Sequence, residues 1–153
     1  MELVNSTGAR AVQIAVKYHK TAGAMFELSF EKGPGEAVLR LDHLVAPGQI
    51  SRYVIEDLFS GIAPLIELLL DQPFTPQKVC LNYAPILPGP VYENAFGCEV
   101  LFEQPYCEYH LPEALLAEPL AGADSITAES CENACRQLLT LFCNNEVWLA
   151  CHQ

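Results

Sequence analysis

The sequence predicts an α+β domain in which helices pack on a mainly antiparallel sheet. Two long stretches carry apolar residues at helical spacing, and several short stretches alternate apolar and polar residues as half-buried strands do. Turn residues separate these stretches, and the predicted order is α-ββ-α-β-α-ββ-α. At 153 residues, the chain is expected to form a single domain over 1–153.

The N-terminal half predicts a helix, a hairpin and a second helix. "NSTGARAVQIAVKYHK" predicts a helix over residues 6–20. In "MFELSFEKGPGEAVLRLD", apolar and polar residues alternate on both sides of a glycine-containing turn, which indicates a hairpin. Arg40 then points away from the core, where it can pair with Glu27 or Glu31 on the other strand. A carboxylate-binding role for Arg40 is the alternative. Residues 51–70 form the longest helical pattern.

The C-terminal half predicts three strands and two further helices. Alternation indicates a strand near residues 79–83, and Pro90 and Gly97 bound a short helix. The stretch "FGCEVLFEQPYCEYHLP" predicts two more strands on either side of "EQP". Residues 124–143 form the last helix, followed by a divergent tail over 144–153.

The composition excludes several classes of function. Hydrophobic residues make up 51% of the chain, and the formal net charge is −11. Lys and Arg together number eight and do not cluster, so we expect no direct contact with nucleic acid and no basic membrane-binding surface. No apolar run is long enough to span a membrane. The start "MELVNSTGAR" lacks a secretion signal, which together with seven cysteines, an odd number, favours a cytoplasmic protein with free thiols.

The close spacing of Cys98, Cys107 and His110 raises the question of a metal site. Zinc ligands must converge on one point, and structural zinc sites use four of them. Alternation places Cys107 and His110 on opposite faces of one strand, and no second Cys or His pair lies at ligand spacing. The expectation is therefore no metal and no cofactor, with a metal site as the minor alternative.

The predicted helix 124–143 carries an apolar stripe that includes two cysteines. Cys131, Cys135, Leu138 and Phe142 fall on one face, and this face is the candidate dimer interface of a homodimer. Packing of the same stripe inside the monomer is an equal alternative. A soft-metal or redox role for the two cysteines is a further, weaker one.

The stretch from Tyr92 to Asp124 resembles part of a known family. "FGCEVLFEQPYCEYHLPEALLAEPLAGAD" is similar to the C-terminal half of the effector-binding domain in one arabinose-binding-domain-like branch of AraC-type bacterial transcription regulators. The order of the upstream elements extends the resemblance to about residues 5–143. Tyr83-Ala84-Pro85 departs from the His-Pro-like pair of this branch, and neither the family's N-terminal β-rich portion nor its helix-turn-helix units are found.

The resemblance implies a ligand-sensing and dimerisation domain that binds a small-molecule effector. Tyr83, Tyr92, Tyr106 and Tyr109 are the candidate ligand-binding residues, because a phenol offers an apolar ring and a hydroxyl that orients a ligand. The alternative is a structural protein–protein interaction module without a ligand. No nucleophile elbow, phosphate-binding loop or HExxH motif occurs, so we do not expect an enzyme.

Overall fold

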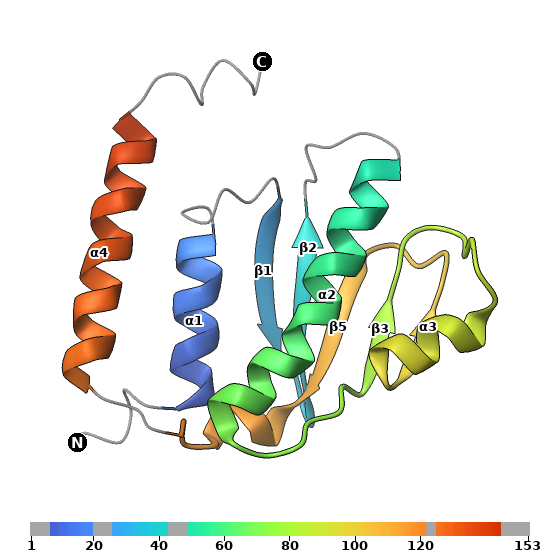
Figure 1. Cartoon of the computed structure of the whole chain (residues 1–153), viewed down its shortest axis with the longest axis horizontal. Coiled ribbons are helices and arrows are strands. Elements are labelled where there is room, and N and C mark those ends of the chain that lie inside the picture. Colours follow the sequence, from blue (N-terminus) through green and yellow to red (C-terminus); the bar gives the residue numbers. More distant parts are fainter. Residues whose placement is uncertain (1–6, 20–25, 43–48, 122–124, 145–153) are drawn as a thin grey trace.

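The computed structural model describes residues 7–19, 26–42, 49–121 and 125–144. Its architecture is α+β, which confirms the predicted fold class, and the elements follow the predicted order (Figure 1). They are α1 (Gly8–Tyr18), β1 (Glu27–Lys32), β2 (Glu36–Asp42), α2 (Gln49–Leu70), β3 (Lys78–Cys80), α3 (Gly89–Phe96), β4 (Glu99–Leu101), β5 (Cys107–Pro112), the 3-10 helix η3 (Glu113–Ala117) and α4 (Ser125–Asn144).

The five strands form one sheet in the order β1-β2-β5-β3-β4. β1 and β2 form the expected antiparallel hairpin, and β5 pairs antiparallel with both β2 and β3. The edge strand β4 pairs parallel with β3, and α3 lies in the connection between them. Parallel neighbours need such a crossover, because a tight turn reverses the direction of the chain. Among the described strands, β5 alone joins the β1–β2 half to the β3–β4 half.

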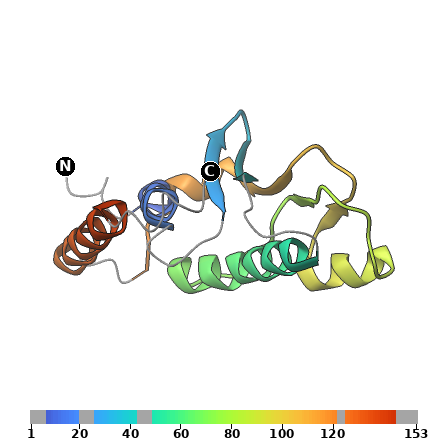
Figure 2. The same cartoon turned by 90° about the horizontal axis from the view of Figure 1, so that it is seen from above.

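The register gives the sheet one apolar and one polar face. Ala37, Val79 and Tyr109 lie on the apolar face and are buried, and α2 and α3 lie on this side (Figure 2). Phe59 of α2 packs edge-on against the ring of Tyr109, with 5.6 Å between centroids. No helix of the described residues covers the opposite face (Figure 2). The polar face carries Glu36, Arg40, Lys78, Cys80, Glu108 and His110.

The hydrophobic core lies between the apolar face and α2. Ile55 and Phe59, which belong to the predicted apolar stripe of this helix, are 3% and 1% exposed. Burying an aliphatic or phenyl side chain of this size contributes roughly 1.5–3 kcal/mol. The core cluster holds α2 and α3 on the same sheet face. Its buried members are Ala37, Leu41, Ile55, Phe59, Val79, Leu81, Tyr92, Phe96, Val100, Cys107, Tyr109, Leu111 and Leu116.

The two outer helices lie at the β1 side of the sheet. α1 contacts β1 and η3, and α4 runs beside α1 (Figure 1). The N–H of Gly8 donates to the carbonyl of Glu118 at 3.0 Å, and a Cβ on Gly8 would overlap the carbonyl oxygen of Leu115. Arg10 of α1 pairs with Glu132 of α4 at 2.5 Å. None of the helices in the described part of the chain has the length and apolar content needed to cross a membrane.

Candidate functional site

A groove of about 340 Å³ lies between α2 and α3. Its volume is at the lower end of the range of about 300–1,000 Å³ that small-molecule pockets occupy. The α2 side carries Tyr53, Glu56 and Asp57, which share one side of the helix because they are spaced by three and four residues. The α3 side supplies Val91 and Tyr92. The groove therefore combines an aromatic and aliphatic lining with two carboxylates.

Tyr92 forms a fixed part of the groove. It is 6% exposed, and its ring lies edge-on to Phe102 with 4.9 Å between centroids. The hydroxyl oxygen of Tyr92 accepts a hydrogen bond from the backbone N–H of Ile86 at 3.3 Å. These contacts hold the ring in one orientation, so the wall that a ligand would meet is formed in advance.

Tyr83 reaches the groove indirectly, through Glu56. Its hydroxyl donates to a Glu56 carboxylate oxygen at 3.0 Å, and the guanidinium of Arg52 stacks on its ring at 4.4 Å. Arg52 also donates to the carbonyl of Ala84 at 3.1 Å, which ties α2 to the segment after β3. Burial, followed by the nearby Glu56 carboxylate, raises the pKa of Tyr83 well above its ordinary value. Tyr83 is thus a neutral hydrogen-bond donor that orients Glu56 at the rim.

The other two predicted ligand-binding tyrosines lie elsewhere. Tyr109 is 1% exposed and packs in the core against Phe59, and burial raises its pKa. Tyr106 is 50% exposed, and Arg40 of the polar face stacks on its ring at 4.4 Å. Of the four predicted tyrosines, Tyr92 alone belongs to the lining of the groove, and Tyr83 contacts that lining through its hydrogen bond to Glu56.

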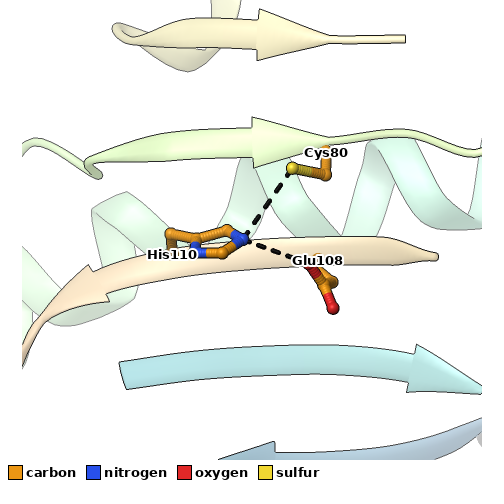
Figure 3. Close-up of side chains that lie close together, drawn as sticks. All are labelled: Cys80, Glu108 and His110. Atoms are coloured by element: carbon orange, nitrogen blue, oxygen red, sulfur yellow. Dashed lines mark hydrogen bonds and ion pairs between the residues drawn. The ribbon is translucent and has the colours of Figure 1, made fainter. Parts of the chain in front are cut away.

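A second cluster of polar and sulfur-containing side chains, Cys80, Glu108 and His110, lies on the polar sheet face (Figure 3). Cys80 of β3 lies opposite Glu108 of β5, and His110 follows two residues later on the same side of β5. The His110 Nε2 atom lies 3.8 Å from the Cys80 sulfur and 3.2 Å from a Glu108 carboxylate oxygen. Burial, followed by the charge of Glu108, raises the pKa of the Cys80 thiol.

His110 and Glu108 each contact a further charged side chain outside this cluster. The Glu36 carboxylate lies 3.0 Å from His110 Nδ1. The other oxygen of Glu108 accepts from Arg40, at 2.9 Å from Nε and 2.8 Å from a terminal nitrogen. That hydrogen bond is the main cause of the raised pKa of Arg40. Arg40 also pairs with Glu31 at 3.3 Å, which confirms the predicted cross-strand partner.

The three residues that raised the metal question in the sequence do not form one cluster. Cys107 is buried on the apolar face, where its thiol donates to the side-chain oxygen of Asn82 at 3.1 Å. Cys98 is half-buried and is not part of the group around His110. The predicted separation of Cys107 from His110 is therefore confirmed, but His110 meets a different cysteine, Cys80, which the sequence pattern did not indicate.

The predicted dimer stripe lies on α4, and α4 contacts α1 through a residue that is not part of this stripe, Glu132. Glu132 turns toward α1, where it pairs with Arg10. Cys131 is exposed, Cys135 is half-buried and Leu138 is 45% exposed. Phe142 belongs to α4, but its side chain lies outside the described residues.

The comparisons with known proteins point to one family. The family model described as the arabinose-binding domain of AraC transcription regulators, N-terminal, matches residues 4–120. The "Ornithine utilization regulator" of Pseudomonas aeruginosa PAO1 is 30% identical over 130 residues, which cover 85% of this chain and 38% of that protein. The chain thus spans well under half of that relative.

A solved structure supports the fold. The crystal structure of the transcriptional regulator CdpR from Pseudomonas aeruginosa matches with a TM-score of 0.67 and 20% identity. The match covers 81% of this chain and 41% of CdpR. Both named relatives are regulators, and the matched family model covers every element from α1 to η3. The chain belongs to the family of arabinose-binding N-terminal domains of AraC-type transcription regulators.

Proposed function

We propose that this chain is the ligand-sensing domain of a transcription regulator, and that the groove between α2 and α3 receives a small amphipathic effector. The preformed wall around Tyr92, facing the Glu56 and Asp57 carboxylates, is the observation that supports this proposal. In this proposal the domain acts in the cytoplasm without catalysing a reaction, and contact with DNA belongs to other parts of a regulator.

The lining indicates which chemistry the effector would carry. An apolar body would lie against Val91, Tyr92 and Phe96, and an amine or another hydrogen-bond donor would face Glu56 and Asp57. The net charge of −11 favours the approach of a cationic compound over that of an anion. One relative is named for the utilization of ornithine, which is itself an amine-bearing compound, so amines are the first class to test.

Titration with matched compounds tests this proposal. Alkylamines, diamines and ornithine would be compared with carboxylates and neutral amides of the same length, by two-dimensional NMR of the 153-residue chain. We expect amines to shift the signals of residues on α2 and α3, and the carboxylates of equal length to leave them unchanged. Shifts confined to other elements, or equal shifts with all compounds, would contradict the assignment of the groove.

A pair of variants separates filling of the groove from a general surface effect. Val91→Trp places a large ring in the groove, where Val91 is 48% exposed, and should abolish the amine response. Ile86→Trp adds the same ring at a 65% exposed position that is not part of the lining, and should keep the response. Equal behaviour of the two variants would show that binding occurs elsewhere.

Dimerisation through α4 is the second candidate function, with or without an effector. The exposure of Cys131 and Leu138 on a helix held by its other side favours it, because an apolar stripe in water is a common feature of interfaces. Light scattering should show a dimer that Leu138→Glu dissociates. Gln137→Glu adds the same charge on another side of the helix and should leave the dimer intact, whereas a monomer at all concentrations would exclude this interface.

A further inference from the structure

We propose that Cys80, Glu108 and His110 form a binding site for a zinc-type divalent transition-metal ion on the polar face of the sheet. The site lies on the side of the sheet opposite α2 and α3, so it is independent of the effector groove. Figure 3 shows the three side chains turned toward one another from β3 and β5. Their sulfur, oxygen and nitrogen atoms all lie within 4.8 Å of one another.

Two of the three separations between ligand atoms lie close to the edges of a tetrahedral coordination shell. With a zinc–sulfur distance of about 2.3 Å and zinc–nitrogen or zinc–oxygen distances of about 2.0–2.1 Å, tetrahedral ligand atoms are separated by roughly 3.3–3.6 Å. The observed separations are 3.8 Å for sulfur to Nε2 and 3.2 Å for Nε2 to the Glu108 oxygen. Small side-chain movements therefore suffice to place one ion in contact with all three residues.

The surroundings of the cluster also match those of metal ligands. Histidines that bind a metal commonly donate their second ring N–H to a carboxylate. The Glu36 carboxylate lies 3.0 Å from His110 Nδ1, which is within hydrogen-bonding distance of such an N–H. Arg40 holds one oxygen of Glu108 and leaves the other oxygen directed at His110. Each of the two β5 residues is thus oriented so that a free lone pair faces the centre of the cluster.

The mixture of donors identifies the class of ion. A thiolate, an imidazole and a carboxylate together suit Zn²⁺ and similar first-row ions, whereas Mg²⁺ and Ca²⁺ prefer oxygen ligands alone. Cys80 would bind as the thiolate and release its proton to the solvent. Three protein ligands leave a fourth position for water or another small ligand. His110 and Cys80 are each 5% exposed, and Glu108 forms the more accessible side of the site.

A metal-free explanation makes a different prediction. A protonated His110 could bridge the Glu36 and Glu108 carboxylates and form an ordinary ion-pair network. That network needs no thiol and gives no reason for an ion to bind. The two explanations therefore differ in metal stoichiometry and in the effect of replacing Cys80.

The test measures Zn²⁺ and Co²⁺ binding by the 153-residue chain. The cysteines of the C-terminal region are first replaced by serine so that they cannot bind the ion; these are Cys131, Cys135, Cys143 and Cys151. Competition with a chromophoric chelator gives the affinity and the number of ions bound. We expect one Zn²⁺ per chain, a rise in the thermal unfolding midpoint with Zn²⁺, and a Co²⁺ spectrum with a sulfur-to-cobalt charge-transfer band.

Four variants locate the site within that background. Cys80→Ser and Glu108→Gln each remove one ligand and should weaken Zn²⁺ binding by about 100-fold or more, and Cys80→Ser should also abolish the charge-transfer band. Glu36→Gln removes only the outer partner of His110 and should weaken binding by roughly 10-fold to 100-fold. Cys98→Ser replaces a half-buried cysteine outside the cluster and should leave the affinity unchanged.

The Glu36 and Glu108 variants keep the test valid if replacement of the buried Cys80 prevents folding. Glu36 has a side chain that is 42% exposed and Glu108 one that is 18% exposed, so the fold should tolerate glutamine at both positions. Circular dichroism verifies this. Absence of a bound ion, or the same affinity in Cys80→Ser, Glu108→Gln and the background protein, would overturn the proposal in favour of the ion-pair network.

Discussion

Replacement of Gly8 by alanine tests how tightly α1 approaches η3. In an open helix, alanine is more stable than glycine by roughly 0.5–1 kcal/mol. At Gly8, however, the new Cβ would overlap the carbonyl oxygen of Leu115, which is backbone and cannot rotate away. Relieving such an overlap by shifting packed elements costs about 1–3 kcal/mol. We therefore expect a net loss of about 1–2 kcal/mol in the free energy of unfolding.

Equilibrium unfolding in urea measures this loss, and Gly61→Ala supplies the control. A loss of about 1–2 kcal/mol lowers the urea midpoint by roughly 0.5–1 M for a typical slope. Gly61 lies in α2 with no atom within 4 Å of a built Cβ, so alanine there should raise the midpoint instead. If Gly8→Ala raised the midpoint as Gly61→Ala does, the close contact of α1 with η3 would be refuted.

Two further predictions concern carboxylates at the ends of the sheet and between the outer helices. Glu113 accepts a hydrogen bond from the Gly35 backbone N–H at 2.9 Å and pairs with Lys32, and these contacts lower the pKa of Glu113 from its ordinary value of 4.5. The ionised Glu113 carboxylate therefore stabilises the fold above about pH 4.5, and this contribution is lost as the pH falls through the lowered pKa. The difference in urea midpoint between the wild type and Glu113→Gln should accordingly shrink below about pH 4.5. Glu132→Gln should loosen α4, because the Glu132 side chain is 13% exposed and pairs with Arg10 at 2.5 Å. We expect the free energy of local unfolding of α4 to fall by roughly 1–2 kcal/mol, which lies between the contributions of exposed and buried ion pairs. Amide hydrogen exchange should then accelerate in α4 while β5 keeps its protection.

The strands and their faces could be predicted from the sequence, but the order of the strands could not. Alternation has a period of two, so it identifies which residues share a face within one strand, as it does for Cys107 and Tyr109. It carries no information about the neighbouring strand. β4 and β5 follow each other across a short turn, yet β3 lies between them in the sheet. That arrangement depends on the α3 crossover and on core packing, which are long-range properties.

The same limit explains what was missed at the two sites. The local hairpin predicts Glu27 or Glu31 as the partner of Arg40, and Glu31 is the one observed. The second partner, Glu108, comes from a distant strand. The contact of Cys80 with His110 likewise requires the β3–β5 register. At the groove, Tyr92 could be predicted because it is aromatic. Glu56 and Asp57 could not, because acidic residues with this spacing are common on any solvent-exposed side of a helix. Alternation within each strand could have assigned Cys80 and His110 to the polar face, but only the pairing of β3 with β5 places them side by side.

The central position of β5 has a consequence for the synthesis of the protein. A nascent chain that has not yet emerged beyond residue 106 holds two separate β pieces, each with an unpaired inner edge. Exposed edges of this kind invite pairing with other chains until the missing strand fills the gap. The sheet thus cannot be completed before β5 has been synthesised, and a stop just before β5 should yield an aggregating product that depends on chaperones.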